Sequence, residues 1–538
     1  MALRNQEDRS LWIPENPHWW QSGVIYQIYP RSFCDSNGDG VGDLNGIVSK
    51  VDYLRKLGID AVWLSPVYTS PMVDFGYDVA DYVGIDPVFG TMEDFDKLLK
   101  TCHEADIRLI MDFVPNHSSS KHPWFQESRK SRDSKKRHWY VWRDPKNGGL
   151  PNNWESYFGG SAWTLDEESG QYYLHSFHQE QPDLNWDNPE VANALGNVMR
   201  FWLAKGVDGF RVDVLWIMGK DPEFRDNLIN PNWNPSMRYW QRQFKEYSEE
   251  WPTSHLRAQY LRSVIEEFDE RVMVAEVVLP PERMVAYYGE GNEAHLPLNF
   301  SFVEIKEWSA PVLREAIQRY ETLMKSNSWP NWFLGNHDFS RIGSRAGKEL
   351  IPLLLTLLLT LRGTPTIYYG EELGMLDAII PEGKSLDPQK RYTPSIDRDA
   401  ARSPMIWNSE KGFGFTFGDP WLPFAPNAHE ITVEEQTGKT GSVLELTRNL
   451  IKLRRKNPAL AVGGLALGLP DSRILSYCRS HPAGDLLVLL NFTSENIQVD
   501  LPAKIENMIF STQRDLDGST EISFELYAFE GVIIRLRS

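Results

Sequence analysis

The sequence predicts an α/β protein whose main domain is a (β/α)8 barrel of the TIM type. Eight short apolar runs recur between residues 24 and 369, with helical patterns between them, and this alternation is typical of a parallel sheet. Three of the runs end in an acidic residue: Asp213, Glu276 and Asp338. A carboxylate beside a buried strand is costly unless it is paired or used, and a barrel of this type carries its chemistry at the C-terminal ends of its strands. We therefore expect one shared site at that rim.

The predicted strands follow the chain in order. They are Val24–Tyr29, Ala61–Leu64, Leu109–Val114, Gly209–Val214, Val272–Val277, Leu296–Phe300, Trp332–Gly335 and Thr366–Tyr369. The spacing of Ile47, Val51, Leu54 and Leu57 predicts one helix that ends at Gly58. A second helix is expected to begin at a capping box at Thr91 and to place apolar residues 95, 98, 99 and 102 on one face.

Three segments interrupt or follow this pattern. Residues 116–189 have little helical periodicity and many Trp, Tyr, Asn, Pro and Gly residues, which favours a domain inserted after strand three. A second excursion, 221–260, is expected to form a wall over the site. Short strands beyond the helical run Leu444–Arg455 predict a separate all-β domain over 458–538. The barrel then comprises residues 1–115 and 190–457.

The composition excludes several classes of protein. A net charge of −18 disfavours nucleic acid as a partner. The three cysteines, at positions 34, 102 and 478, have neither disulfide nor metal-site spacing. The first 14 residues lack the apolar segment of a secretory signal, and the longest apolar run, Ile351–Leu361, is too short to cross a bilayer. These features predict a cytoplasmic protein without a membrane partner.

Two of the acidic residues can be given chemical roles from their neighbours. Arg211 lies two residues before Asp213, on the same side of a strand, so we expect it to lower the pKa of Asp213 and keep this carboxylate ionised as a nucleophile. Glu276 follows an apolar run, where desolvation raises a carboxyl's pKa and suits it to donate a proton. The structural alternatives are an Arg–Asp pair inside the barrel and a Glu paired with a nearby Lys or Arg.

Further polar residues stand at the ends of strands three and seven. Asp112 could pair with Arg211, and His117 could donate a hydrogen bond to a hydroxyl group. His337 and Asp338 could each contact hydroxyl groups, and a third carboxylate would raise the pKa of Glu276 further. The alternatives are a structural histidine and an Asp that caps a helix. Two carboxyls on opposite sides of a glycosidic bond hydrolyse it, and a separation of about 5–5.5 Å retains the anomeric configuration.

A separate motif follows the first strand. Asp35, Asn37, Asp39, Val41 and Asp43 match the first half of a calcium loop, D-x-[DN]-x-[DN]-G. Gly46 stands where that loop carries its final Glu, and Asp43 could compensate. The alternative is an Asp/Gly turn without a metal. We expect a structural Ca²⁺, with Mg²⁺ as the alternative ion, and no organic cofactor.

Taken together, these motifs resemble glycoside hydrolase family 13, the α-amylase family, and within it the α-glucosidase and oligo-1,6-glucosidase group. The resemblance covers nearly the whole chain. It rests on Asp112-Phe-Val-Pro-Asn-His117, Gly209-Phe-Arg-Val-Asp213, Ala275-Glu276, Asn336-His-Asp338 and Gln181-Pro-Asp-Leu-Asn185. It implies a catalytic barrel, an inserted B domain and a C-terminal β-sandwich. It also implies Asp213 as nucleophile, Glu276 as general acid/base and Asp338 as stabiliser of the transition state.

The resemblance also implies a substrate pocket. Asp112, His117, Arg211 and His337 match positions around the non-reducing glucose, and Asp74 and Tyr77 match residues that grip it in exo-acting members. Arg402, in Ala-Arg-Ser-Pro-Met, matches a late arginine, and we expect an Asp74–Arg402 ion pair to close the pocket behind one sugar. Val214 resembles the residue of members that prefer α-1,6 bonds, whereas Lys220–Asn227 resembles members of broader preference.

The sequence thus predicts a retaining exo-acting α-glucosidase that releases glucose from short α-glucosides such as maltose, isomaltose or sucrose-like substrates. The expected partner is a small oligosaccharide or disaccharide, and the expected state is a monomer or weak homodimer. The alternative is an α-glucosyltransferase or a sucrose or trehalose isomerase of the same family, because such enzymes share the covalent intermediate and differ in how well they exclude water. A non-enzymatic, membrane-anchored relative is disfavoured because the carboxylates are present and an anchor is not.

Overall fold

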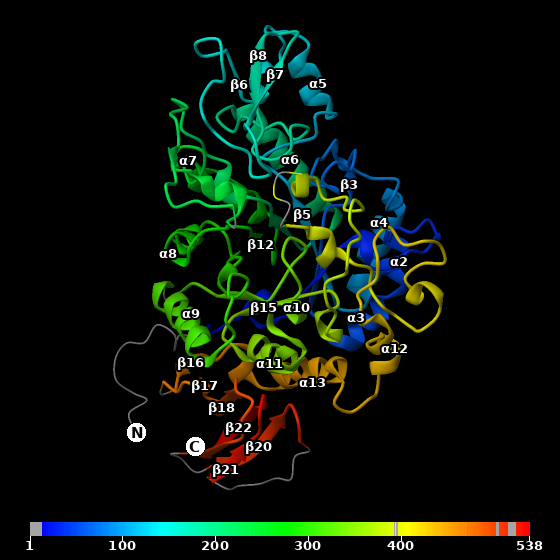
Figure 1. The fold of residues 1–538 in the computed structure, drawn as a ribbon, viewed down its shortest axis with the longest axis vertical. Helices are drawn as coiled ribbons and strands as arrows, with labels where there is room; N and C mark the ends of the chain where they lie inside the picture. The colour runs from blue at the N-terminus through cyan, green and yellow to red at the C-terminus, as the bar shows by residue number, and fades with distance from the viewer. Residues whose placement is uncertain are drawn as a thin grey trace.

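The computed structural model contains a nearly closed barrel of eight parallel strands (Figure 1). It describes residues 13–235, 237–325, 327–391, 393, 396–468, 470–501, 505–514 and 523–537. The barrel strands are β1 (Ile25–Ile28), β2 (Ala61–Leu64), β5 (Arg108–Phe113), β9 (Gly209–Val212), β12 (Val272–Ala275), β13 (Leu296–Pro297), β14 (Asn331–Phe333) and β15 (Thr364–Tyr368). Each overlaps one predicted strand, so the predicted barrel is confirmed.

The register of the barrel brings the polar strand ends together. Arg211 on β9 pairs with Asp112 on β5 and with Val274 on β12. Backbone hydrogen bonds continue past the strands, from Asp213 N to Phe113 O at 2.8 Å and from Glu276 N to Val212 O at 2.9 Å. Asp213 and Glu276 therefore leave neighbouring strands at the same level of the rim.

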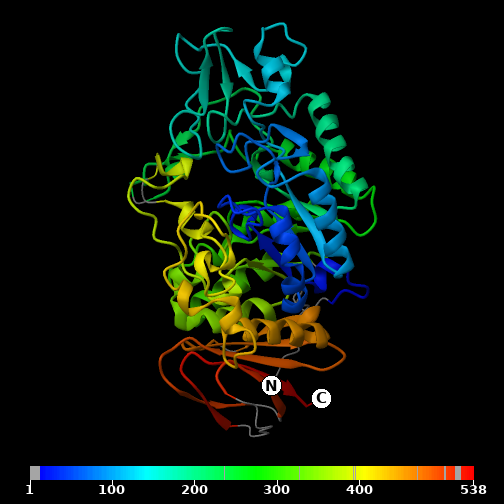
Figure 2. The ribbon, with the colours of Figure 1, turned by 90° about the vertical axis from the view of Figure 1, so that its right-hand side faces the viewer.

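Helices cover the outside of the barrel (Figures 1 and 2). The longer ones are α4 (Met92–Glu104), α6 (Pro189–Lys205), α7 (Thr253–Ile265), α9 (Ala310–Leu323), α11 (Ile351–Thr360) and α13 (Val443–Lys456). The predicted capping box at Thr91 is present and the expected apolar face of α4 is buried. The helix expected over 47–57 is two helices, α2 (Leu44–Ser49) and α3 (Val51–Leu57), because Lys50 between them has non-helical angles. Within the described ranges, no helix is long and apolar enough to cross a membrane.

Residues 116–189 form an irregular unit at one end of the molecule, shown in cyan in Figure 2. It contains α5 (Pro123–Arg129) and a three-stranded antiparallel sheet of β6 (Trp142–Arg143), β8 (Gln171–Leu174) and β7 (Trp163–Asp166). A small apolar cluster around Trp154 and Trp163 belongs to this unit. Its limits as a domain, like those of the others, remain predictions.

The C-terminal all-β region lies at the opposite end (Figure 2). Its five-stranded sheet contains β16 (Gly464–Leu467), β17 (Ile474–Ser480), β18 (Leu486–Asn491), β22 (Gly531–Leu536) and β20 (Ile505–Ser511); β19 (Ile497–Asp500) pairs with β21 (Ser523–Leu526). Residues of β18 alternate between two cores: Val488 and Leu490 belong to the main core, to which α11 also contributes, and Leu489 packs with Leu526 of β21. This alternation follows from the two-residue period of a strand.

Candidate active site

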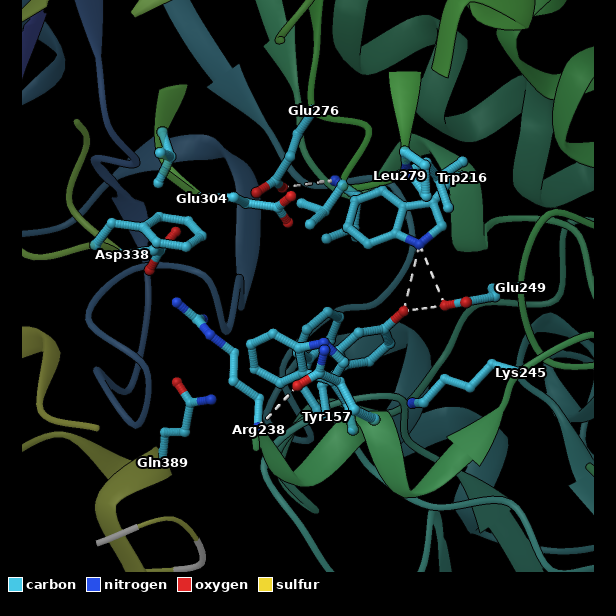
Figure 3. A pocket seen from close by; sticks show the side chains of 18 of the residues that line it. Tyr157, Trp216, Arg238, Lys245, Glu249, Glu276, Leu279, Glu304, Asp338 and Gln389 are labelled. Carbon is cyan, nitrogen blue, oxygen red and sulfur yellow. Dashed lines mark hydrogen bonds between the residues drawn. The ribbon is translucent and has the colours of Figure 1, made fainter. Parts of the chain in front are cut away.

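A cavity of about 1470 Å³ opens at the C-terminal rim of the barrel (Figure 3). Asp213, Glu276 and Asp338 all line it, so the expected convergence of the three carboxylates occurs. Five other predicted residues also line it: Asp74, Tyr77, His117, Val214 and His337. The excursion 221–260 supplies one wall through β11 (Gln243–Phe244) and residues of the segment that joins β10 (Leu228–Ile229) to β11.

Arg211 organises the first group of carboxylates. Its side chain is buried, and Nη1 donates to Asp112 Oδ1 at 2.8 Å and to Asp213 Oδ1 at 2.7 Å. Its Nη2 lies 2.8 Å from Glu276 Oε2. Asp213 and Glu276 therefore lie at two nitrogens of one guanidinium, which places them in the same cavity and within reach of one small group.

One positive charge cannot compensate three carboxylates fully. Burial raises the pKa of Asp213 well above its usual value, and Glu276 adds to this effect while Arg211 opposes it. Burial likewise raises the pKa of Glu276, against Arg211, and raises that of Asp112 to about 6. The expectation that Arg211 gives Asp213 a lowered pKa is therefore wrong in sign, because desolvation outweighs the ion pair. The Asp213–Glu276 pair titrates as a unit that retains a proton readily.

Val214 positions Glu276 through its backbone. It adopts a left-handed conformation (φ 41°, ψ 44°), which is strained for a β-branched residue. In this conformation its N–H donates to Glu276 Oε2 at 3.1 Å. The backbone of the residue after Asp213 thus holds the Glu276 carboxyl.

A second charged group closes one side of the cavity. Arg398 donates to Asp74 Oδ1 and to Asp387 Oδ1 at 2.7 Å each, and to Asp338 Oδ1 at 3.2 Å. Burial opposes the charge of Arg398, but these three carboxylates outweigh it and raise its pKa. Burial raises the pKa of Asp338, yet His337, Arg398 and Arg402 together hold it below its usual range. Asp338 is therefore an ionised carboxylate.

The predicted Asp74–Arg402 pair is wrong: Asp74 pairs with Arg398. Arg402 instead donates to Asp338 Oδ1 at 3.0 Å and to the His337 carbonyl at 2.8 Å. The two arginines lie at the two ends of one short helix, η11 (Arg398–Arg402), and Asp387 anchors the first of them. The sequence offers both within four residues, and only the fold shows which one reaches the cavity.

The remaining predicted residues form a hydrogen-bonded layer. Tyr77 lies with its hydroxyl 3.0 Å from Asp112 Oδ2 and 2.7 Å from His337 Nε2, and Gln27 contacts His337 Nδ1 at 2.8 Å. His117 contacts Gln181 Nε2 at 3.3 Å. Burial lowers the pKa of His117 to about 4 and that of His337 to about 3, so both rings are neutral donors or acceptors near neutral pH.

Sequence reasoning missed four residues near the cavity: Asp387, Arg398, Arg238 and Glu304. Asp387 and Arg398 lie in a segment whose charged residues can be read from the sequence, but whose course through the fold cannot. Arg238 and Glu304 lie on loops and follow no strand directly, so their positions carry no periodic signal. Both line the cavity.

The loop after β1 is built from successive side chain to backbone turns. Asp35 accepts from the N–H groups of residues 37, 38 and 40 and from Thr416, and Asp43 accepts from Ser36 and from Gly46 N. Asn37 and Asp39 each accept one N–H, from Asp39 and Val41. A Cβ at Gly46 would lie 1.9 Å from the Cys34 carbonyl oxygen, which explains why no Glu stands there. Across the described ranges, no three acidic, His or Cys side chains converge where a metal ion could bind.

The geometry suits chemistry at an electrophilic carbon. Two coupled carboxyls can share one proton, so that one attacks while the other donates. Asp338, an ionised carboxylate, can stabilise positive charge that develops beside them. The Asp74–Arg398 pair closes the same side of the cavity and offers both an acceptor and donors to hydroxyl groups.

The chain is similar to known proteins over nearly its full length. Residues 27–463 match the family model described as the catalytic domain of alpha amylase. The chain is 37% identical to the oligo-1,6-glucosidase of Parageobacillus thermoglucosidasius, over 96% of this chain and 99% of that protein. It is 40% identical to a probable α-glucosidase of Rhizobium meliloti (strain 1021), over 93% and 94%. The crystal structure of the α-glucosyl transfer enzyme XgtA has a TM-score of 0.91 and 36% identity, over 97% of this chain and 100% of that one. The chain therefore belongs to the α-amylase family, glycoside hydrolase family 13.

Proposed function

We propose that the protein is a retaining α-glucosidase that removes one glucose at a time from the non-reducing end of short α-glucosides. The observation that carries this proposal is the shared contact of Asp213 and Glu276 with Arg211, beside a cavity side closed by Asp74 and Arg398. A site closed behind one sugar favours release of single glucose units over cleavage inside a polymer. The relatives named oligo-1,6-glucosidase and α-glucosidase support it.

The proposed reaction has two steps. In the first, an oxygen of Asp213 bonds to the anomeric carbon, the glycosidic C–O bond breaks, and Glu276 gives its proton to the departing oxygen. In the second, Glu276 takes a proton from water, the water oxygen bonds to the same carbon, and the bond to Asp213 breaks. Asp338 stabilises the positive charge of both transition states.

The variant Asp213→Asn tests the nucleophile. The change is nearly isosteric, so the fold is expected to persist while turnover falls by at least about 10⁴-fold, as when a nucleophile is removed from other enzymes. Initial rates on maltose and isomaltose measure the loss, and circular dichroism checks the fold. Near-normal turnover in a folded variant would reject the assignment. The anomer released first, followed by NMR, tests retention.

Transfer of glucose to a sugar is the second candidate, because the neighbouring structure of XgtA is named an α-glucosyl transfer enzyme. The isomerase alternative remains a prediction, and so does the enzyme's preference for α-1,6 bonds that Val214 suggests. Initial rates and products on glucobioses of α-1,1, α-1,2, α-1,3, α-1,4 and α-1,6 linkage, and on sucrose, separate these activities. A cytoplasmic location and a monomeric or weakly dimeric state also remain predictions, for fractionation and sedimentation to test.

We also propose a structural Ca²⁺, or Mg²⁺, in the loop 35–43. The donor set consists only of oxygens, which these hard cations require. Asp39 uses one of its two carboxylate oxygens in the backbone turns, and the single amide oxygen of Asn37 accepts one N–H. Both would supply ligands, with the Val41 carbonyl. Asp35 and Asp43 are already occupied by several N–H and O–H donors and would contribute less. Elemental analysis after dialysis, with Asp39→Ala as the control, is expected to find one ion per chain in the parent protein only.

A further inference from the structure

Arg238 and Glu304, two oppositely charged side chains, both line the cavity. The guanidinium carbon of Arg238 lies 4.7 Å from the ring centre of Trp240 and 4.5 Å from that of Phe339. Two aromatic rings therefore hold it in place. Among the residues that the structure describes, neither Arg238 nor Glu304 is within ion-pair distance of an opposite charge. Arg211, Arg398 and Arg402, at the same rim, instead contact carboxylates.

The two side chains reach the cavity from different loops. Arg238 lies on the wall between β10 and β11, and Glu304 follows η7 (Phe300–Phe302), just after β13. Figure 3 shows Glu304 beside Glu276, and the Arg238 side chain extending toward Asp338 and Glu304. Arg238 is within electrostatic reach of both these carboxylates. A space is thus left between the hydrogen-bond donors of Arg238 and the acceptor oxygens of Glu304, next to Glu276.

The chemistry of this space selects its occupant. An anion would pair with Arg238 but be repelled by Glu304 and Asp338, and a cation would meet the reverse situation. An apolar group would leave both charges desolvated without partners. A neutral polyhydroxyl compound satisfies both, because each hydroxyl group accepts from a guanidinium and donates to a carboxylate. Aromatic rings nearby, Tyr157 stacked with Phe177 and tilted against Trp240, offer faces to sugar C–H groups.

We propose that Arg238 and Glu304 form the binding site for the second sugar: the leaving group of a disaccharide and the acceptor in transfer. This proposal rests on the proposed function, because it assumes that Glu276 protonates the departing oxygen. The neutral sugar unit binds through hydrogen bonds from Arg238 and to Glu304. Arg238 and Glu304 thereby favour a sugar over water at the moment when Glu276 acts as base.

The test compares two donors in Arg238→Gln and Glu304→Gln. Maltose and isomaltose place a second sugar in the proposed site, whereas 4-nitrophenyl α-D-glucopyranoside carries no hydroxyl groups there. Loss of a hydrogen bond to a charged group predicts a fall in kcat/KM of about 10- to 100-fold for the disaccharides. The nitrophenyl donor is expected to change by less than about threefold. Arg238→Lys, which keeps a charged donor, is expected to recover part of the loss.

A second readout does not depend on the amount of folded enzyme. With the nitrophenyl donor and added cellobiose, whose β bond a retaining α-glucosidase does not cleave, the shortfall of free glucose relative to nitrophenol measures transfer. This shortfall is expected to shrink in both variants. Arg283→Gln is the matched control, because Arg283 also lines the cavity but is exposed and paired with Glu250. Equal losses on both donors, or unchanged disaccharide rates, would overturn the proposal. If the parent protein hydrolyses none of these α-glucosides, the proposed function fails first.

Discussion

Arginines are buried in two regions of this molecule, and their partners differ in kind. At the rim of the barrel, Arg211, Arg398 and Arg402 contact the carboxylates that line the cavity or lie beside it. At the junction with the C-terminal region, Arg454 and Arg479 contact only backbone carbonyls in the part of the chain that the structure describes. Buried charge by itself therefore does not mark an active site.

The junction arginines close the end of a helix. Arg479 donates to the carbonyls of Thr360, Leu460, Gly463 and Gly464, and Arg454 donates to those of residues 359, 361, 363, 460 and 461. The last carbonyls of α11 have no partner within the helix, and a cation there also suits the helix dipole. Burial, reinforced by Arg454, lowers the pKa of Arg479 to about 9. At the rim, carboxylates instead raise the pKa of Arg398.

Among the arginines of the two regions, the largest expected effect separates Arg398 from Arg402. Arg398→Ala removes the partner of Asp74 and Asp387, so we expect kcat/KM for maltose to fall by about 10²- to 10³-fold, in line with the cost of breaking a buried ion pair. The Arg402 side chain contacts Asp338 from behind the cavity, so Arg402→Ala is expected to lower kcat/KM by about tenfold. Thermal unfolding of both variants controls for loss of fold. An equal or larger loss for Arg402 would restore it as the residue that closes the pocket.

The sequence predicted the barrel better than the loops around it, for a physical reason. Each strand is a short apolar run whose burial dictates its residue types. Asp213 and Glu276 follow such runs directly, and Asp338 follows β14 after a short turn. The positions of Arg398, Arg238 and Glu304 depend instead on how irregular segments pack against each other. No local pattern encodes that packing, which is why the sequence predicts Arg402 in place of Arg398.

Electrostatic balance was equally hidden from the sequence. The spacing of Arg211 and Asp213 correctly predicted their ion pair, at 2.7 Å. It could not show that Asp112 and Glu276 share the same guanidinium, or that all four side chains are buried. The net direction of a pKa shift depends on the sum of these terms, so one correct contact still gave the wrong sign for Asp213.

The next effect is on stability and belongs to the junction. Arg479→Met keeps most of the side-chain volume but leaves several buried carbonyls without a donor. We expect the free energy of unfolding to fall by about 3 kcal/mol, from the loss of buried hydrogen bonds to a charged group. Chemical denaturation measures the fall, and KM for maltose is expected to stay within about twofold. A changed KM with unchanged stability would contradict the division between the two regions.

The smallest expected effect, taken over one pH unit, is on the pH dependence of stability and concerns Glu371. This buried carboxyl lies near Arg341 and Arg345 but makes no ion-pair contact within the described residues. It accepts a hydrogen bond from Tyr368 N, and burial raises its pKa to about 8. A carboxyl whose pKa is higher in the folded than in the unfolded state stabilises the fold fully below about pH 4.4 and loses this contribution as the pH rises through its folded pKa. Between those limits stability is expected to fall by at most about 1.4 kcal/mol per pH unit. Glu371→Gln, which cannot ionise, is expected to flatten this slope by about one proton, while the exposed Glu434→Gln leaves it unchanged. An identical pH dependence of unfolding in the parent protein and Glu371→Gln would contradict this prediction. It would show that a nearby guanidinium keeps Glu371 ionised without an ion-pair contact, whereas Asp338 is kept ionised by direct contacts.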